Sequence, residues 1–345
     1  LSKPGTGTEI AFNSLDMGRF KLGCSCLGGS KKVINEVADY AQNRQAFGTT
    51  ISSFDAIIKK VAEMTIRTFA VDSMIYRTIG SIQSEIDLLK KDDDNYFPKM
   101  IKAMEKFAIE TSMVKVFASD TSHWVIDEGL QIFGGYGFLE EYPLAPAYRD
   151  DRINQIWEGT NEINRTIIAG FFMKKALTEE IPVHKAIADI DSFFDKENAG
   201  FFKGPLKDES LTIEIAKKVF LYIFNEALCC FGQDLQHEQQ ITELLSNIMM
   251  DIYNVESTIV RAKKIFKNNK NSKVIEIAKV ISSDMVDQIE VSSRKIAVSI
   301  EKQGSSNISF KKLKKMVEEM RLNTDTIQLK REIANYVFNE NKYPY

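Results

Sequence analysis

Residues that interrupt helices are scarce in this chain, which has 345 residues but only seven prolines and eighteen glycines. No apolar run is long enough to cross a bilayer as a helix. The first residues also lack the basic, apolar and small-residue zones of a signal peptide. The formal net charge is −3, which does not indicate a nucleic-acid binder. The composition is typical of a globular protein, and the length favours two domains.

Cysteine and histidine are equally sparse. The four cysteines, Cys24, Cys26, Cys229 and Cys230, form two tight clusters that do not resemble a disulfide framework. No histidine lies near either cluster at the spacing of a zinc site. We therefore interpret the cysteines as small, buried, apolar residues in a reducing compartment, and we predict no metal site.

Hydrophobic residues recur at helical spacing along most of the chain. Apolar positions follow the i, i+3, i+4, i+7 pattern in several segments, among them Phe54–Val61, Val274–Ile281 and Leu313–Met320. Alternating patterns with hairpin turns, which would indicate strands, are nearly absent. The chain is therefore predicted to be all-α.

Long helices with short connections favour an antiparallel four-helix bundle in the first half. The polar tract at 90–95 would separate the second helix from the third, and Pro98 suits the first turn of the third. An irregular stretch then precedes the fourth helix. The expected helices lie at about 15–42, 53–90, 96–133 and 160–177.

Three segments are predicted along the chain. Residues 1–14 open with a loop-like stretch that contains proline and glycine, and they resemble a linker or the end of a preceding domain. The bundle is expected at 15–178. A boundary at 179–182 then precedes a second helical domain at 183–345.

Between Gln131 and Arg165 the helical pattern is interrupted, and two features of this stretch have both a structural and a functional interpretation. The pair Gly134-Gly135 can end a helix, or it can let another molecule approach the backbone. Glu158 can be an acidic residue favoured by a helix dipole, or a carboxylate base in an apolar pocket between Trp157 and Gly159. The residue pattern alone leaves both pairs of alternatives open.

Several motifs in this region resemble the C-terminal helical domain of acyl-CoA dehydrogenases, over roughly the first 175 residues. They occur in the order and at the spacing of that family. The motifs are RQAFG at Arg44–Gly48, QIFGGYGF at Gln131–Phe138, the pair Arg149-Asp150 and IWEGTNEINR at Ile156–Arg165.

This resemblance implies a reaction and a cofactor. Glu158 matches the base that removes the α-proton of a fatty acyl-CoA thioester while the β-hydrogen leaves as hydride to FAD, giving the trans-2-enoyl-CoA. Gly159 would let the thioester lie close to the backbone. Thr160, Asn161 and Glu162 match positions that contact FAD. The implied electron acceptor is an electron-transferring flavoprotein.

Other matched positions lie outside the Glu158 motif. Arg44 and Phe47 match residues that reach the FAD of a neighbouring subunit, which implies a homodimer or a larger homo-oligomer. Gln131, Gly134 and Gly135 match the segment that faces the adenosine end of the cofactor. Asp16 and Arg19 match positions that hold the CoA moiety. The implied location is cytoplasmic in a bacterium or mitochondrial in a eukaryote, and not secreted.

The chain also departs from the family pattern. Some branches carry the catalytic glutamate at the position of Gly18, which leaves Glu158 as the base candidate here. Phe54-Asp55 replaces a His-Gln pair of medium-chain members, which favours the very-long-chain branch. The N-terminal α-domain and the middle β-domain of the family have no counterpart in the sequence, so we expect the chain alone to bind FAD weakly and to show little turnover.

The second half carries no motif that indicates catalysis. Basic stretches at 261–273 and 311–315 predict either peripheral contact with an anionic membrane or solvated helix faces compensated by Glu318 and Glu319. Two alternatives to the dehydrogenase also stand. One is a non-catalytic helical assembly or docking module of the same family, and the other is an acyl-CoA oxidase.

Overall fold

The computed structural model describes residues 7–195, 202–303 and 308–345. These residues form two compact units. The first unit holds the chain up to Ile168 together with Ala334–Tyr345, and the second unit is Ala169–Ile333. The described part is almost entirely helical, with strands only in one short hairpin, which confirms the all-α prediction.

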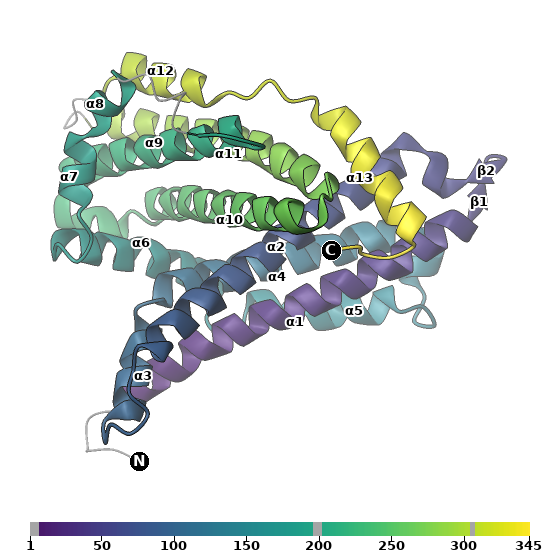
Figure 1. Cartoon of the computed structure of the whole chain (residues 1–345), viewed down its shortest axis with the longest axis horizontal. Coiled ribbons are helices and arrows are strands. Elements are labelled where there is room, and N and C mark those ends of the chain that lie inside the picture. Colours follow the sequence, from purple (N-terminus) through teal and green to yellow (C-terminus); the bar gives the residue numbers. More distant parts are fainter. Residues whose placement is uncertain (1–6, 196–201, 304–307) are drawn as a thin grey trace. The chain divides into compact units, whose positions relative to one another are not determined.

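Three long helices make up the first unit: α1 (Gly7–Asn43), α2 (Asp55–Asp87) and α4 (Ala108–Phe133), which pack pairwise. A hairpin of β1 (Gln45–Ala46) and β2 (Thr49–Thr50), followed by the short turn η1 (Ile51–Ser53), reverses the chain between α1 and α2. Figure 1 shows α2 running back from this hairpin toward α3 (Tyr96–Glu105), from which α4 returns.

The core of the first unit follows from the periodicity of its apolar residues. One stripe of each long helix is fully buried, because residues three or four positions apart lie on one helix face. Bulky residues of α2 and α4 fill the centre, and alanines let α1 approach closely. The fully buried residues include Ile34, Val37, Ala38 and Ala41 of α1, Met64, Phe69 and Ala70 of α2, and Val116 and Val125 of α4.

The structure corrects several predicted boundaries. α1 already begins at Gly7, so the predicted linker at 1–14 is helical from there on, and residues 1–6 lie outside the described residues. The third predicted helix is divided into α3 and α4 around Lys106 and Phe107. The stretch expected to be irregular contains three short helical segments, which are η2 (Gly134–Phe138), α5 (Leu144–Asp151) and η3 (Arg152–Gln155).

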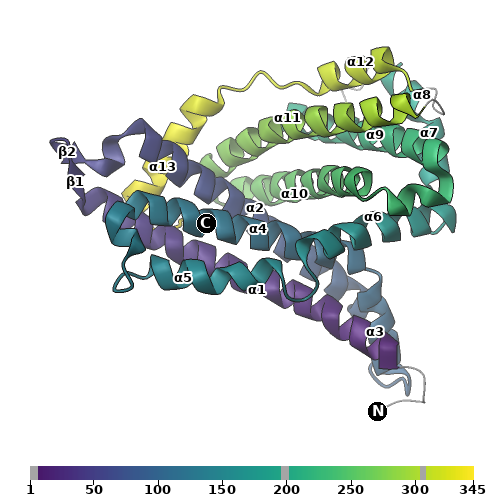
Figure 2. The ribbon, with the colours of Figure 1, turned by 180° about the vertical axis from the view of Figure 1, so that it is seen from behind.

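The fourth long helix, α6 (Asn161–Leu177), begins within one residue of its predicted start. Figure 2 shows α5 and α6 on either side of the short stretch that joins them. This stretch carries Glu158 and leads directly into the first turn of α6.

The second unit is a separate helical array. Its elements are α7 (Val183–Ala188), α8 (Ile190–Phe194), α9 (Lys207–Phe231), η5 (Gly232–His237), α10 (Gln239–Asn269), α11 (Lys273–Lys302), α12 (Phe310–Met320) and the start of α13 (Thr326–Glu340). The apolar stripes predicted at Val274–Ile281 and Leu313–Met320 are buried on α11 and α12. None of the described helices in either unit is long and apolar enough to span a membrane.

Charges on α12 are compensated within the second unit. Lys314 and Lys315 lie 3.8 Å from Glu318 and Glu319, one helical turn away, and Lys312 contacts Asp191 at 2.6 Å. Such i, i+4 pairs are typical of a solvated helix face. For residues 311–315 they favour a solvated helix face over membrane contact. Membrane contact through the segment 183–345 remains a prediction.

The structure differs from two further predictions, which concern the domain boundary and the burial of the cysteines. The compact units divide the chain between Ile168 and Ala169, whereas the sequence predicted a boundary at 179–182. The reason is that α6 continues through both units without a break. Among the cysteines only Cys26 is buried, while Cys24 and Cys229 are exposed.

The final segment of the chain packs on α1 and α2 of the first unit. The backbone N–H of Tyr343 donates to Asn35 Oδ1 at 2.6 Å, and the Lys31 ammonium lies 5.1 Å from the centre of the Tyr343 ring. The Tyr345 ring meets the fully buried Phe69 edge to face at 5.4 Å. The predicted domain at 183–345 therefore includes residues that belong to the bundle.

Replacing Tyr343 by alanine should lower the free energy of unfolding by about 2–3 kcal/mol, because the variant loses a buried aromatic ring. Urea denaturation followed by circular dichroism measures the change. Glu340→Ala, an exposed position in the same segment, is the matched control and should leave stability unchanged. Equal stability of the Tyr343 variant and the wild type would show that the segment contributes nothing to the bundle.

Candidate functional site

Glu158 lies in a strained turn between η3 and α6. Its φ angle is +57° and that of Gly159 is +80°, so two consecutive residues adopt the left-handed conformation. This region is readily accessible to glycine but costs free energy for a residue with a side chain. The turn therefore persists only because its surroundings hold it.

Side chains from three helices hold the backbone of this turn. Arg19 of α1 donates from Nε to the Glu158 carbonyl at 3.1 Å, and Lys115 of α4 donates to the Gly159 carbonyl at 2.9 Å. Asn164 of α6 donates to the carbonyls of Gly159 and Thr160 at 2.7 and 3.1 Å. In a trans peptide the N–H points away from the C=O, so the N–H groups that follow these carbonyls face away from the three side chains.

The carboxylate of Glu158 occupies the space above Gly18 of α1. A Cβ atom built on Gly18 would lie 2.5 Å from Glu158 Oε2 and 2.7 Å from Oε1. These distances are far below a normal contact, so the carboxylate has room only because residue 18 has no side chain. The two alternative glutamate positions considered from the sequence, 18 and 158, therefore meet at one place in the fold.

Large apolar residues close to Glu158 in the sequence are exposed. Trp157 is 51% exposed, and its indole N–H donates to Asn154 Oδ1 at 3.1 Å. Ile153, Ile156 and Ile163 are also exposed for large hydrophobic residues. The exposed side chains of Ile156 and Trp157, which directly precede Glu158 in the sequence, are called the apolar rim. The apolar pocket expected around Glu158 remains a prediction.

Asp16 and Arg19, predicted to bind CoA, are both buried. Arg19 is 4% exposed and pairs with Asp16 at 2.7 Å. Burial raises the pKa of Asp16, and the neighbouring Arg19 opposes that shift. Because Arg19 also holds the Glu158 carbonyl, the contacts of this pair support a role in shaping the turn.

The side chain of Asn161 points into the interior, where it joins a polar network on α4. Its Oδ1 accepts from Lys115 Nζ at 2.6 Å, and its Nδ2 donates to Asp120 at 2.7 Å and to Ser119 at 3.0 Å. Arg165 donates to the other oxygen of Asp120 at 3.0 Å. With its side chain engaged in this way, Asn161 can offer a cofactor only its backbone.

Thr160 and Glu162 stabilise the start of α6. The Thr160 hydroxyl accepts from the backbone N–H of Ile163 at 3.3 Å, which is a typical N-cap contact. Hydrogen bonds from its own backbone amide and from the Thr160 hydroxyl lower the pKa of Glu162. The helix-terminus role that the sequence left open for Glu158 is thus filled by Glu162.

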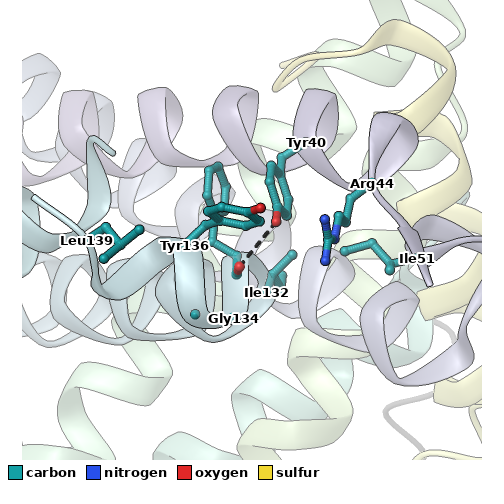
Figure 3. Close-up of a pocket in the computed structure, with 9 residues that line it drawn as sticks. Tyr40, Arg44, Ile51, Ile132, Gly134, Tyr136 and Leu139 are labelled. Atoms are coloured by element: carbon teal, nitrogen blue, oxygen red, sulfur yellow. Dashed lines mark hydrogen bonds between the residues drawn. The ribbon is translucent and has the colours of Figure 1, made fainter. Parts of the chain in front are cut away.

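A second group of predicted residues gathers around a pocket of about 360 Å³ where α1 and α4 end. Figure 3 shows Tyr40, Arg44 and Tyr136 directed toward the same space. The Arg44 guanidinium lies 5.3 Å from the centre of the Tyr136 ring, and Tyr40 donates to the Phe133 carbonyl at 3.2 Å. The other lining residues are Ile51, Ile132, Gly134, Gly135 and Leu139.

Gly134 is the residue at which α4 ends. Its φ of +59° with ψ of −137° is a conformation reserved for glycine, and it opens the turn into η2. The helix-ending interpretation of Gly134 is therefore correct. It is compatible with ligand approach, because Gln131, Gly134 and Gly135 are all exposed and a Cβ on either glycine would meet no atom within 4 Å.

The tip of the hairpin beside this pocket exposes a large aromatic side chain. Phe47 is 97% exposed and has a φ of +54°, followed by Gly48 at +84°. Consecutive left-handed residues suit a two-residue hairpin turn. The Phe47 ring is thus almost fully open to solvent at the tip of the hairpin.

Two family models, each described as the C-terminal domain of acyl-CoA dehydrogenase, match residues 5–172 and 215–315. The chain belongs to the acyl-CoA dehydrogenase family. The probable acyl-CoA dehydrogenase of Bacillus subtilis (strain 168) is 34% identical to it over 349 residues, covering 99% of this chain and 58% of that protein. The crystal structure of an acyl-CoA dehydrogenase complexed with FAD from Bacillus anthracis aligns with a TM-score of 0.92 and 32% identity, covering 100% of this chain and 59% of that one.

This acyl-CoA dehydrogenase chain thus spans less than two thirds of the length of these relatives. The very long-chain specific mitochondrial enzyme of Rattus norvegicus is 35% identical, but over only 49% of this chain and 23% of that protein. The predicted membership of the very-long-chain branch is not confirmed. The same holds for the prediction of a shortened form, since a relative matches along 99% of the chain.

The structure places the predicted residues of this chain in two groups. Glu158 lies with Gly159 to Glu162, Asp16 and Arg19, and the pocket is lined by Arg44, Gly134 and Gly135. Gln131 precedes the lining residue Ile132 on α4, and Phe47 lies in the hairpin that follows Arg44. Sequence reasoning missed Lys115, Ser119 and Asn164. A usable signal was present for Lys115, because it is the one polar residue in the apolar run 113–118.

Gly18→Ala should displace the Glu158 carboxylate without unfolding the bundle, because only the flexible end of that side chain blocks the new methyl group. Alanine is also the better helix former by about 1 kcal/mol. Crystal structures of the variant and the wild type measure the displacement. Gly28→Ala on the same helix meets no atom within 4 Å and should leave Glu158 in place. An unmoved carboxylate in Gly18→Ala would contradict the packing described here.

Proposed function

We propose that this chain forms the helical part of an FAD-dependent dehydrogenase that oxidises fatty acyl-CoA to trans-2-enoyl-CoA, with Glu158 as the base. One observation carries the proposal. The Glu158 carboxylate stands above Gly18 at a strained turn whose carbonyls accept from Arg19, Lys115 and Asn164, so that the N–H groups of the turn point away from these side chains. A base and hydrogen-bond donors are thereby held side by side.

This arrangement suits the removal of a proton next to a thioester carbonyl. Such a proton is a far weaker acid than a carboxylic acid, so the charge that develops on the carbonyl oxygen needs stabilisation. Backbone N–H groups of the Glu158 turn are donors of the required kind. Glu158 would take the proton at a carboxylate oxygen, and Gly159 would let the thioester lie against the backbone. The exposed apolar rim of Trp157 and Ile156 would exclude water once covered.

Two sets of residues would hold the cofactor. Arg44, Phe47, Gln131, Gly134 and Gly135 would bind the FAD of a neighbouring subunit, and Thr160, Glu162 and the backbone of Asn161 would contact the FAD of their own. FAD, when bound, accepts the hydride from the β-carbon. The pocket fits such a group, because the Arg44 guanidinium beside it can pair with phosphate oxygens.

The remaining proposals concern partners. The exposed Phe47 and Arg44 support a homodimer or a larger homo-oligomer in which each chain completes its neighbour's cofactor site. An electron-transferring flavoprotein is the proposed acceptor of electrons, and the very-long-chain branch and an intracellular location are proposed with it.

The alternative of an acyl-CoA oxidase differs in using oxygen as the acceptor. A non-catalytic docking module would need neither Glu158 nor FAD.

Glu158→Gln should lower the turnover number by at least about 10³-fold, because the amide cannot accept the α-proton. The assay uses the complete product of the gene with acyl-CoA substrates of several lengths and a dye as electron acceptor. Glu36→Gln, at an exposed position of α1, is the control. Full activity of Glu158→Gln would refute the assignment. FAD binding without any turnover in the wild type would favour the docking module, and reduction of oxygen in place of the dye would favour the oxidase.

Arg44→Ala should weaken FAD binding about 10- to 100-fold, since a charge-assisted hydrogen bond contributes roughly 1.5–3 kcal/mol. The dissociation constant is measured by fluorescence titration of the apoprotein. Arg294→Ala, at an exposed position in the second unit, serves as control. If Arg44→Ala and Arg294→Ala bind FAD equally well, the pocket beside Arg44 does not hold the cofactor.

A further inference from the structure

Lys115 is a fully buried cation on α4, with 0% of its surface exposed. Its neighbours along the chain, Val114 and Val116, are buried apolar residues. Removing an ammonium group from water costs several kcal/mol unless it is well hydrogen-bonded. A lysine at this position therefore needs hydrogen-bond acceptors that compensate for its burial.

Among the described residues, both hydrogen-bond acceptors of the Lys115 ammonium belong to the segment that carries Glu158. Its Nζ donates to the Gly159 carbonyl at 2.9 Å and to Asn161 Oδ1 at 2.6 Å. These residues flank Thr160, and both are more than forty positions away from Lys115 in the sequence. A single ammonium group thus ties both sides of the turn to α4.

Other side chains alone do not supply the same hold. Asn164 also donates to the Gly159 carbonyl, but it belongs to α6 and moves with the segment that it holds. Arg19 reaches only the Glu158 carbonyl, from α1. Ser119 and Asp120 of α4 also bind the side chain of Asn161, but neither reaches a backbone carbonyl of the turn. Of the three donors to these carbonyls, Lys115 is the one that lies on α4. Glu158 immediately precedes Gly159 and depends on that hold for its left-handed backbone.

We propose that Lys115 is a positioning residue for Glu158: by binding Gly159 and Asn161 it fixes the turn that directs the carboxylate over Gly18. The inference rests on the proposed role of Glu158 as base for its catalytic meaning. The hold of Lys115 on the turn can be tested without measuring turnover.

The charge of Lys115 provides a means of testing the hold. Burial lowers the pKa of Lys115 to about 8, opposed by Asp120 on α4, Cys26 on α1 and Glu162 on α6, and assisted by Arg19 on α1. Below that pH an ammonium group holds the turn. Above it a neutral amine remains, and its hydrogen bonds are weaker because they are no longer charge-assisted. The turn should therefore change as the pH rises through about 8.

Trp157 reports on the turn, because it is adjacent to Glu158 and half exposed. The only other tryptophan is Trp124, whose ring lies 4.3 Å from the Arg67 guanidinium. Incorporating 5-fluorotryptophan into the 345-residue chain therefore gives two ¹⁹F resonances, which Trp124→Phe assigns. The experiment follows both resonances from pH 6.5 to 9.5 and records thermal unfolding of each variant in parallel.

We expect the Trp157 resonance to shift with a midpoint near pH 8 while the Trp124 resonance stays constant. Lys115→Met should abolish this titration and displace the Trp157 resonance already at pH 7. His123→Gln should keep the titration of the Trp157 resonance. His123 contacts Asp151, which accepts a hydrogen bond from Asn154, the residue that binds the Trp157 indole. Lys263→Met is the matched control. Burial also lowers the pKa of Lys263, which donates to Ser210 in the second unit, so the variant can lose stability without moving the Trp157 resonance.

A Trp157 resonance that is constant across this range in the wild type would overturn the proposal, and so would an unchanged titration in Lys115→Met. If Lys115→Met does not fold, ¹³C labelling of lysine Cε in the wild type decides. The Lys115 midpoint must then coincide with that of Trp157, and a mismatch rejects the proposal. The two proposals fail separately. Full activity of Glu158→Gln would leave this result standing, and a constant Trp157 resonance would leave Glu158 as the base.

Discussion

The first unit depends on one constraint: the backbone carbonyls at 158–160 must be held from outside the turn that contains them. Glu158 and Gly159 both have positive φ angles, and their carbonyls accept hydrogen bonds from side chains. Arg19, Lys115 and Asn164 supply the missing donors from α1, α4 and α6. The mutual packing of these helices therefore serves to keep three donors at fixed distances around one short segment.

Much of this architecture can be predicted from the sequence, because the apolar residues recur with the period of a helix. Apolar stripes predicted the long helices, and the order of short motifs identified Glu158 and the empty position at Gly18. The short elements between Gly134 and Gln155 escaped prediction, because segments of four to eight residues carry too little periodicity to distinguish a turn of helix from a loop. The break between α3 and α4 carries no proline or glycine to mark it.

The site was harder to predict than the fold. A motif states which residue types occur together, but not which way each side chain faces. Asn161 lies in the same motif as Glu158, yet its side chain turns inward to Lys115 and Asp120. Arg19 was expected to hold the CoA moiety, and it is buried in a pair with Asp16. Both outcomes depend on contacts between residues far apart in the sequence, which one chain without its fold does not reveal.

The final segment has a consequence for how the molecule is made. The chain leaves the first unit at Ile168 and returns to it at Ala334, so the second unit is an insertion whose two ends are both fixed. Tyr343 and Asn35 are 308 positions apart, and their contact closes one of the longest loops that the chain allows. During synthesis, the contacts of α1 and α2 with residues 334–345 can form only after those residues have left the ribosome. Until then the bundle has an uncovered face, on which a chaperone or a second nascent chain can bind.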